Sequence, residues 1–175
     1  MQIRPLRESD DRSTFRSGDV ELDRFFGRYA GQNQFRHHLG VTYVAVEGTD
    51  IRGYATVAPG NVEGDDLPSS TRRRVPRYPV PVLRLARLAV AESARSSGLG
   101  SALLRHVFTL AIKMSGDSGC AGVVVDAKAG SVEFYRRFGF SALEVSAGQL
   151  ETRPRPTAMF LPLELIARAA VPPDG

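Results

Sequence analysis

A short glycine-containing turn constrains the fold of this 175-residue chain more than any other feature. It joins an apolar run, residues 82–90, to a run with apolar side chains at helical spacing, and it reads Ala94-Arg95-Ser96-Ser97-Gly98-Leu99-Gly100-Ser101. A turn that leads into a helix presents several unpaired backbone N–H groups at one point, and the helix dipole adds partial positive charge there. The sequence therefore predicts a strand–turn–helix unit suited to bind a phosphate or pyrophosphate.

The predicted strand before this turn changes phase along its length. Leu83 and Leu85 share one parity, whereas Leu88 and Val90 share the other. Because successive side chains of a strand point to opposite faces, the change predicts a β-bulge near residues 86–87. A strand buried on both faces would have no phase to lose, but two arginines inside the run argue against that alternative. We therefore expect a splayed strand with backbone groups free to bind an extended ligand.

Strand and helix patterns alternate along the rest of the chain. Strands are predicted over residues 3–6, 42–46, 51–57, 123–125, 141–145 and 158–163, and helices over residues 20–29, 101–114 and 131–138. Asp19 and Gly139 are the expected caps of the first and last helices. Pro162 cannot donate to a ladder, which predicts an edge position for the last strand.

This alternation indicates an α/β fold with a mixed, mostly antiparallel sheet of six to seven strands flanked by helices. Residues 59–81 are predicted to form a long loop within one domain, which extends over residues 1–168. A disordered tail is predicted over residues 169–175.

Composition is compatible with a small cytoplasmic enzyme. The chain is 42% hydrophobic, which suffices for one sizeable core, and it contains no long apolar run. From its polar first residues we expect no signal peptide. Cys120 is the only cysteine, so no internal disulfide can form, and we expect it to be a small buried side chain. Two of the 23 basic residues are lysines and the others are arginines; either phosphate recognition or, as the alternative, codon bias would explain that preference.

Two segments resemble the GNAT superfamily of N-acetyltransferases. Arg95-x-x-Gly98-x-Gly100 is similar to the motif that binds the acyl-CoA pyrophosphate. A second block, with the strand 122–127 and the helical run Ser131-Val132-Glu133-Phe134-Tyr135-Arg136-Arg137-Phe138-Gly139-Phe140, resembles the next strand and helix of the superfamily. The resemblance covers nearly the whole chain and implies the GNAT fold, with acetyl-CoA as co-substrate and direct attack of an amine on its thioester.

The resemblance also implies roles for individual residues. The acetyl-CoA site it implies comprises Leu88, Ala89 and Val90 on the bulged strand, the turn Arg95, Ser96, Ser97, Gly98, Leu99, Gly100 and Ser101, and further along Lys128 and Ser131. A backbone N–H near Leu88 is the implied oxyanion donor. The resemblance implies Tyr135 as the candidate catalytic residue, whose phenol would protonate the departing thiolate; the alternative is a core tyrosine with its hydroxyl at the surface. No metal is expected.

The sequence departs from the superfamily at one place, because Lys128 occupies a position where many members have asparagine. Lys128 could contact a CoA phosphate or lie in solvent. No general base stands out: Glu92, His37 and His38 are expected at the surface. A base is not required if the acceptor is an α-amine, because its pKa of about 8 leaves roughly a tenth of it neutral at pH 7, far more than of a lysine amine at about 10.4.

The N-terminal block reads Phe15-Arg16-Ser17-Gly18-Asp19-Val20-Glu21-Leu22-Asp23-Arg24-Phe25-Phe26. It further resembles the GNAT toxins of type II toxin–antitoxin modules. This resemblance implies acetylation of the α-amine of aminoacyl-tRNA, a small DNA-binding antitoxin as partner, and a homodimer. No membrane partner is expected.

The acceptor stays open at this point. Arg72, Arg73, Arg74 and Arg77, with Arg84 and Arg87, form either a surface for the tRNA backbone or solvated positions that balance nearby acids. The alternative acceptors are a small-molecule amine and a protein N-terminus. A non-catalytic acyl-CoA-binding or nucleotide-binding module is the other class, although a dinucleotide fingerprint would need a third glycine where Leu103 stands.

Overall fold

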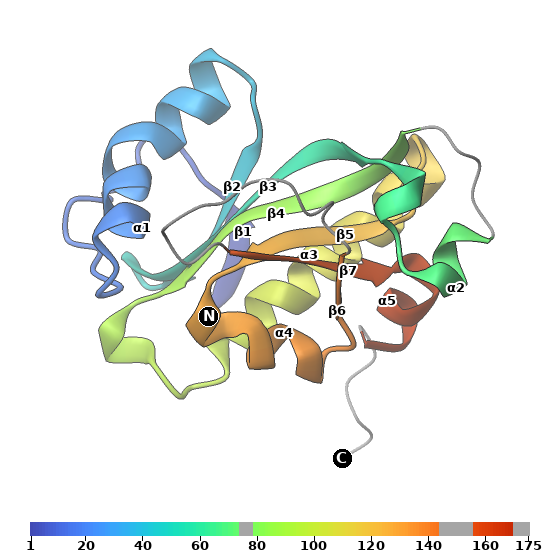
Figure 1. Ribbon diagram of the computed structural model, residues 1–175. Helices are drawn as coiled ribbons and strands as arrows, with labels where there is room; N and C mark the ends of the chain where they lie inside the picture. The colour runs from blue at the N-terminus through green and yellow to red at the C-terminus, as the bar shows by residue number, and fades with distance from the viewer. Residues whose placement is uncertain (74–78, 144–155, 170–175) are drawn as a thin grey trace, which may run out of the picture. The chain divides into compact units, whose positions relative to one another are not determined.

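The computed structural model describes residues 1–73, 79–143 and 156–169, and its seven strands form one mixed sheet in the order β1-β2-β3-β4-β5-β7-β6 (Figure 1). The strands are β1 Gln2–Pro5, β2 Val41–Glu47, β3 Asp50–Val62, β4 Val80–Val90, β5 Gly122–Ala127, β6 Ser141–Ala142 and β7 Thr157–Pro162. The α-helices are α1 Val20–Arg24, α2 Ser69–Arg72, α3 Leu99–Asp117, α4 Val132–Arg137 and α5 Leu163–Ala169. The predicted α/β class and strand number are confirmed.

The chain divides into two compact units. The first comprises Met1–Ala58 and Leu85–Val107, and the second comprises Pro59–Arg84 and Phe108–Gly175. Three elements, β3, β4 and α3, contribute residues to both units.

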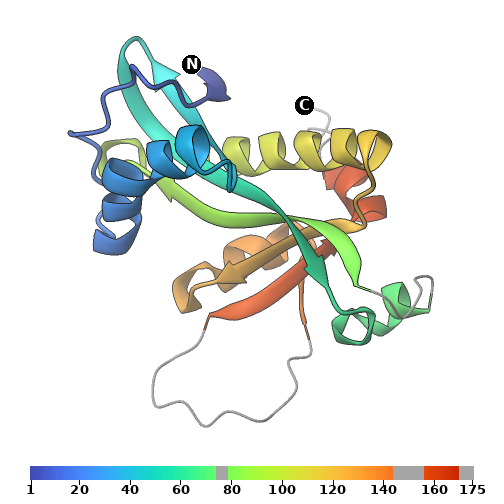
Figure 2. The same ribbon diagram turned by 90° about the horizontal axis from the view of Figure 1, so that it is seen from above.

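In the first unit, helical segments cover both faces of β3. Tyr54 is fully buried and stacks on Phe26, with ring centroids 4.4 Å apart, and its hydroxyl donates a hydrogen bond of 2.7 Å to the carbonyl of Leu22 in α1. The preceding residue, Gly53, faces Leu99 and Leu103 of α3. Because adjacent strand residues point to opposite faces, α1 and the first part of α3 lie on opposite sides of β3 (Figure 2).

The helical stretch predicted over residues 20–29 continues to Arg36, and most of it is π-helical. Asp19 caps α1 as expected, accepting hydrogen bonds from the backbone N–H groups of Glu21 and Leu22. Two π-helical segments follow, η1 Phe25–Tyr29 and η2 Gln32–Arg36. A π-turn holds more residues than an α-turn, so Ala30 takes the buried position, whereas the predicted stripe residue Tyr29 is 46% exposed.

The second unit has its own core on each side of β5 and β7, which pair antiparallel with Val124 opposite Phe160. One cluster contains Val62, Leu67, Val80, Val82, Val124 and Phe160. Elsewhere in the unit, Phe108 of α3 contacts the rings of Phe138 and Phe140. Gly139, at φ 99°, ends α4 in the left-handed conformation that its predicted C-cap role requires.

Several predictions for this unit are wrong. The predicted loop 59–81 instead contains the end of β3, a 3-10 turn at Gly64–Asp66, helix α2 and the start of β4; residues 74–78 lie outside the described residues. The last strand, β7, is not at the edge, because β6 pairs with its outer side. Pro162 is tolerated there because it is the final residue of β7, and the ladder's N–H is supplied by Leu163, which donates to the carbonyl of Ala121.

The C-terminal boundaries also differ from the predictions. The predicted strand 141–145 is described only as β6, since residues 144–155 lie outside the described part. Helix α5 was not predicted; it buries Ile166 and extends to Ala169, the first residue of the predicted tail, and residues 170–175 lie outside the described part.

Candidate functional site

The turn before α3 has the backbone conformation of an anion-binding concavity. After β4, a 3-10 segment Glu92–Ala94 leads into the turn, where Ser96 and Gly98 have φ values of 61° and 81°. Left-handed residues within a turn direct successive N–H groups to one side. A Cβ built on Gly98 would meet no atom within 4 Å, so the space in front of the turn is open. The first amides of α3 follow at once, without partners inside the helix.

Arg95 is bound by the N-terminal loop. Its Nη2 donates a hydrogen bond of 2.5 Å to the carbonyl of Ser17, and a Cβ on Gly18 would lie 2.6 Å from the same nitrogen and 2.7 Å from Oε1 of Glu92. Gly18, at φ 89°, therefore leaves the room that this contact needs. Arg95 therefore anchors the turn to the N-terminal loop, which leaves the backbone amides of the turn as its candidate anion donors. Sequence reasoning missed Ser17 and Gly18 as parts of this arrangement.

The burial pattern of β4 differs from the predicted phase change. Leu83, Leu85 and Ala89 are buried, whereas Leu88 and Val90 are half-buried. Two adjacent buried residues, Val82 and Leu83, mark the change of phase, so side-chain burial does not place it at residues 86–87. The bulge itself remains a prediction.

The two arginines inside β4 each have a partner. Arg84 forms an ion pair with Asp126 at 3.3 Å, within the second unit. Arg87 lies over the ring of Phe25, 3.7 Å from the centroid, within the first unit. Of the other predicted tRNA contacts, Arg72 and Arg73 are exposed, whereas Arg74 and Arg77 lie outside the described residues.

Tyr135, the candidate general acid, is buried in the second unit. It is 5% exposed, and its ring makes edge contacts with Phe134 and Phe140 at centroid distances of 5.1 and 5.3 Å. Burial raises the pKa of the phenol above its ordinary value near 10, so the hydroxyl is protonated at neutral pH. Its hydroxyl makes no hydrogen bond to another described residue. Lys128 is exposed, and its carbonyl accepts from the N–H of Ser131 at 2.8 Å, one turn before α4.

The remaining candidates lie where they were expected. His37, His38 and Glu92 are exposed. Cys120 is buried, and burial raises the pKa of its thiol. Within residues 1–73, 79–143 and 156–169, no cluster of His, Cys, Asp or Glu could hold a metal ion. In the same ranges no helix has the length and apolar character to span a membrane.

Two cavities of the first unit were not predicted from the sequence. One, of about 520 Å³, lies among residues 11–16, 49–52 and 91–93. The other, of about 600 Å³, lies between residues 8–12 and the helical stretch 28–36. The arginines that line the second are scattered over 25 residues of sequence, so no local motif could have revealed them.

Comparison with known proteins gives matches over most of the chain. Residues 38–142 match the family model described as acetyltransferase (GNAT) domain. A tRNA-acetylating toxin of Mycobacterium tuberculosis is 34% identical over 140 residues, which is 78% of this chain and 82% of the toxin. AtaT complexed with acetyl-methionyl-tRNAfMet superposes with a TM-score of 0.83 at 24% identity, covering 95% of this chain and 97% of AtaT. AtaTR bound with AcCoA gives 0.78 at 25% identity, covering 95% and 96%.

Proposed function

The chain belongs to the GNAT acetyltransferase family, and on that basis we propose that it transfers the acetyl group of acetyl-CoA to the α-amine of an aminoacyl-tRNA. The general activity, N-acetyl transfer from acetyl-CoA, follows from the family. The acceptor is carried by one observation, the 34% identity to a tRNA-acetylating toxin over 78% of the chain.

The turn fits the pyrophosphate of acetyl-CoA in its donor chemistry. The donors are neutral backbone N–H groups of Ser96 to Ser101 at the start of a 19-residue helix, and the open space before Gly98 lets a phosphate approach them. Leu88, Ala89 and Val90 would pair through their backbone with the pantetheine arm. Lys128 and Ser131, in the turn that precedes α4, are the further proposed contacts.

The chain's own groups would then supply two functions during transfer. The amine nitrogen bonds to the thioester carbonyl carbon, the carbon–sulfur bond breaks, and the amine proton passes to solvent. A backbone N–H near Leu88 stabilises the oxyanion, a contribution worth on the order of 3 kcal/mol. The Tyr135 phenol donates its proton to the leaving sulfur and is reprotonated from solvent; burial raises its pKa, so the hydroxyl carries the proton to be donated at neutral pH.

An α-amine suits a site without a dedicated base. With a pKa of about 8, roughly a tenth of it is neutral at pH 7, against less than about a thousandth of a lysine amine whose pKa is about 10.4. Among the candidates named from sequence, His37, His38 and Glu92 are all exposed. The proposal therefore requires no side chain to remove a proton from the acceptor.

Two further elements complete the proposal. A small DNA-binding antitoxin would neutralise the enzyme; solved relatives include an AtaT–AtaR complex bound to DNA. We also propose a cytoplasmic location, which a single reduced, buried cysteine favours. The homodimer remains a prediction from the resemblance.

Acetyl transfer from labelled acetyl-CoA to a pool of charged tRNAs tests the function. Uncharged tRNA and the Tyr135→Phe variant are the controls. Label on charged tRNA only, and its loss in the variant, is the expected result. Absence of label, with protein shown to bind acetyl-CoA, would rule out the tRNA acceptor and direct the search to small amines and protein N-termini.

A further inference from the structure

A basic pocket in the first unit lies outside the residues assigned to acetyl transfer. Its volume is about 600 Å³, and its charged lining consists of Arg12, Arg28, Arg36 and Glu8. None of the four has an ion pair or hydrogen bond to another described side chain. Three guanidinium groups thus surround one space with a single carboxylate among them, which favours an anionic ligand.

Gly31 creates the position of the Arg12 guanidinium. A Cβ built on Gly31 would lie 2.6 Å from Nη1 and 3.0 Å from Nη2 of Arg12, so the guanidinium packs directly on the helix backbone. Nη1 of Arg12 is buried and has no hydrogen-bond partner in the described part of the chain. A buried donor without a partner is costly, and a bound anion would satisfy it.

The two other arginines come from the π-wound stretch. Arg28 belongs to η1 and Arg36 to η2, and Gly31 lies between them on the pocket-lining face. Both arginine side chains are exposed. π-turns are uncommon and occur frequently at functional sites, and here they bring the two arginines to one cavity.

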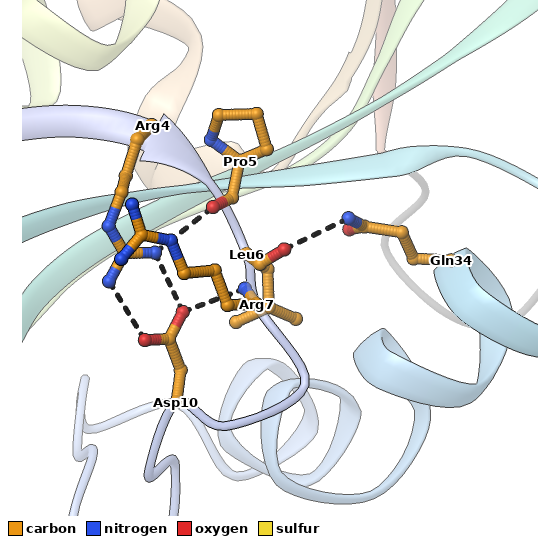
Figure 3. Close-up of polar contacts among 6 residues, drawn as sticks. All are labelled: Arg4, Pro5, Leu6, Arg7, Asp10 and Gln34. Atoms are coloured by element: carbon orange, nitrogen blue, oxygen red, sulfur yellow. Dashed lines mark hydrogen bonds and ion pairs between the residues drawn. The ribbon is translucent and has the colours of Figure 1, made fainter.

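Both walls of the pocket are held in place by hydrogen bonds (Figure 3). In the loop before Arg12, Asp10 accepts two hydrogen bonds of 2.8 Å from Arg4 and a third from the backbone N–H of Arg7. In η2, Gln34 donates to the carbonyl of Leu6 and accepts from the N–H of Thr42. The guanidinium groups are therefore presented by fixed backbone, which lowers the entropy lost on binding.

We infer that this pocket binds a backbone phosphate of the tRNA acceptor, an inference that rests on the proposed function. A phosphate presents several oxygens at once to converging guanidinium forks. An acidic peptide would in addition need apolar anchor positions, and the only apolar side chain among the described lining residues is Phe35. Such a contact contributes affinity without reading sequence.

A matched pair of glycine substitutions tests the geometry. Gly31→Ala would displace the Arg12 guanidinium, whereas Gly27→Ala, in the same helical stretch, adds a methyl group that meets no atom within 4 Å. Gly31 has helical dihedrals, φ −65° and ψ −45°, so alanine causes no backbone strain there. We expect Gly31→Ala to weaken tRNA binding about tenfold at low salt, and Gly27→Ala to bind like the wild type.

Arginine variants test the charge. Arg28→Ala and Arg36→Ala should weaken tRNA binding and reduce the salt slope of log K by about 0.7–0.9 for each phosphate that the variant no longer neutralises. Arg168→Ala, which removes an exposed arginine of α5 in the second unit, is the charge-matched control. Fluorescence anisotropy with uncharged tRNA measures binding, calorimetry checks that acetyl-CoA binding is unchanged, and thermal melting checks the fold.

The outcomes separate this inference from the proposed function. If the wild type acetylates charged tRNA but Gly31→Ala and the arginine variants bind tRNA as the wild type does, the pocket inference is overturned and the function stands. If the wild type acetylates no charged tRNA, the proposed function fails first. Loss of polyglutamate binding in these variants, with tRNA binding unchanged, would overturn the inference and identify a site for acidic peptides instead.

Discussion

Replacing Tyr135 by phenylalanine should separate catalysis from folding. The ring of Tyr135 contacts Phe134 and Phe140, and those contacts remain in Tyr135→Phe. The hydroxyl has no hydrogen bond to another described residue, so its removal costs none. We expect the free energy of unfolding to change by less than about 1 kcal/mol, because a buried hydroxyl without a partner stabilises little.

The effect on turnover should be large. Loss of a general acid typically lowers kcat by about 10²–10⁴, or roughly 3–5 kcal/mol of transition-state free energy. Steady-state acetylation of charged tRNA gives kcat, and urea unfolding gives the stability. Burial raises the pKa of the phenol, so the wild type should show no loss of activity from Tyr135 ionisation as pH rises toward 10.

Tyr54→Phe is the matched control, because it removes the same atom from another buried tyrosine. The hydroxyl of Tyr54 donates to the carbonyl of Leu22 at 2.7 Å, so its loss should cost about 1 kcal/mol of stability and leave kcat unchanged. If Tyr135→Phe kept more than a tenth of the wild-type kcat, the assignment of Tyr135 as general acid would be refuted. A stability loss equal to that of Tyr54→Phe would indicate a structural role.

Three other substitutions test the turn, the N-terminal loop and the sheet. Gly98→Ala places a side chain at φ 81°, which costs about 1–2 kcal/mol of strain, and calorimetry should show about tenfold weaker acetyl-CoA binding with only a modest fall in melting temperature. The hydrogen bond from Arg4 holds the pKa of Asp10 below its ordinary value. The ionised carboxylate of Asp10 therefore stabilises the fold above about pH 4, and this contribution is lost as the pH falls through the folded-state pKa. In urea unfolding, the free energies of unfolding of the wild type and Asp10→Asn should converge in acid. Gly122→Ala puts a Cβ against the carbonyl of Leu161, and we expect a loss of at least about 2 kcal/mol in thermal unfolding.

The sequence predicted most clearly what local chemistry decides. The Asp19 cap, the Gly139 turn and the strand–turn–helix unit around Gly98 each depend on residues adjacent in the chain, and the first two are confirmed. The left-handed φ of Gly98 agrees with the predicted turn. Ligand contacts of that turn remain predictions, because they depend on groups that no local pattern contains.

Contacts between residues distant in sequence decide the features that the sequence did not predict. Pro162 indicates an edge strand when read alone, but β6 pairs outside β7 and Pro162 only ends it. The π-turns of η1 cannot be read from an apolar stripe, which predicts burial of Tyr29, whereas Ala30 is the residue that is buried. The contact of Arg95 with Ser17 joins residues 78 positions apart and left no local signal.

The burial of Cys120 has a practical consequence for work on this protein. The chain has no other cysteine, and this thiol is 7% exposed with a pKa raised by burial, so thiolate-directed reagents should react with it slowly in the native state. A cysteine introduced at Leu39, which is 62% exposed, would then be the one fast-reacting thiol. A single fluorophore can thus be attached near η2 to follow encounters with RNA directly. Cys120 does not first have to be replaced, because it competes little for the reagent.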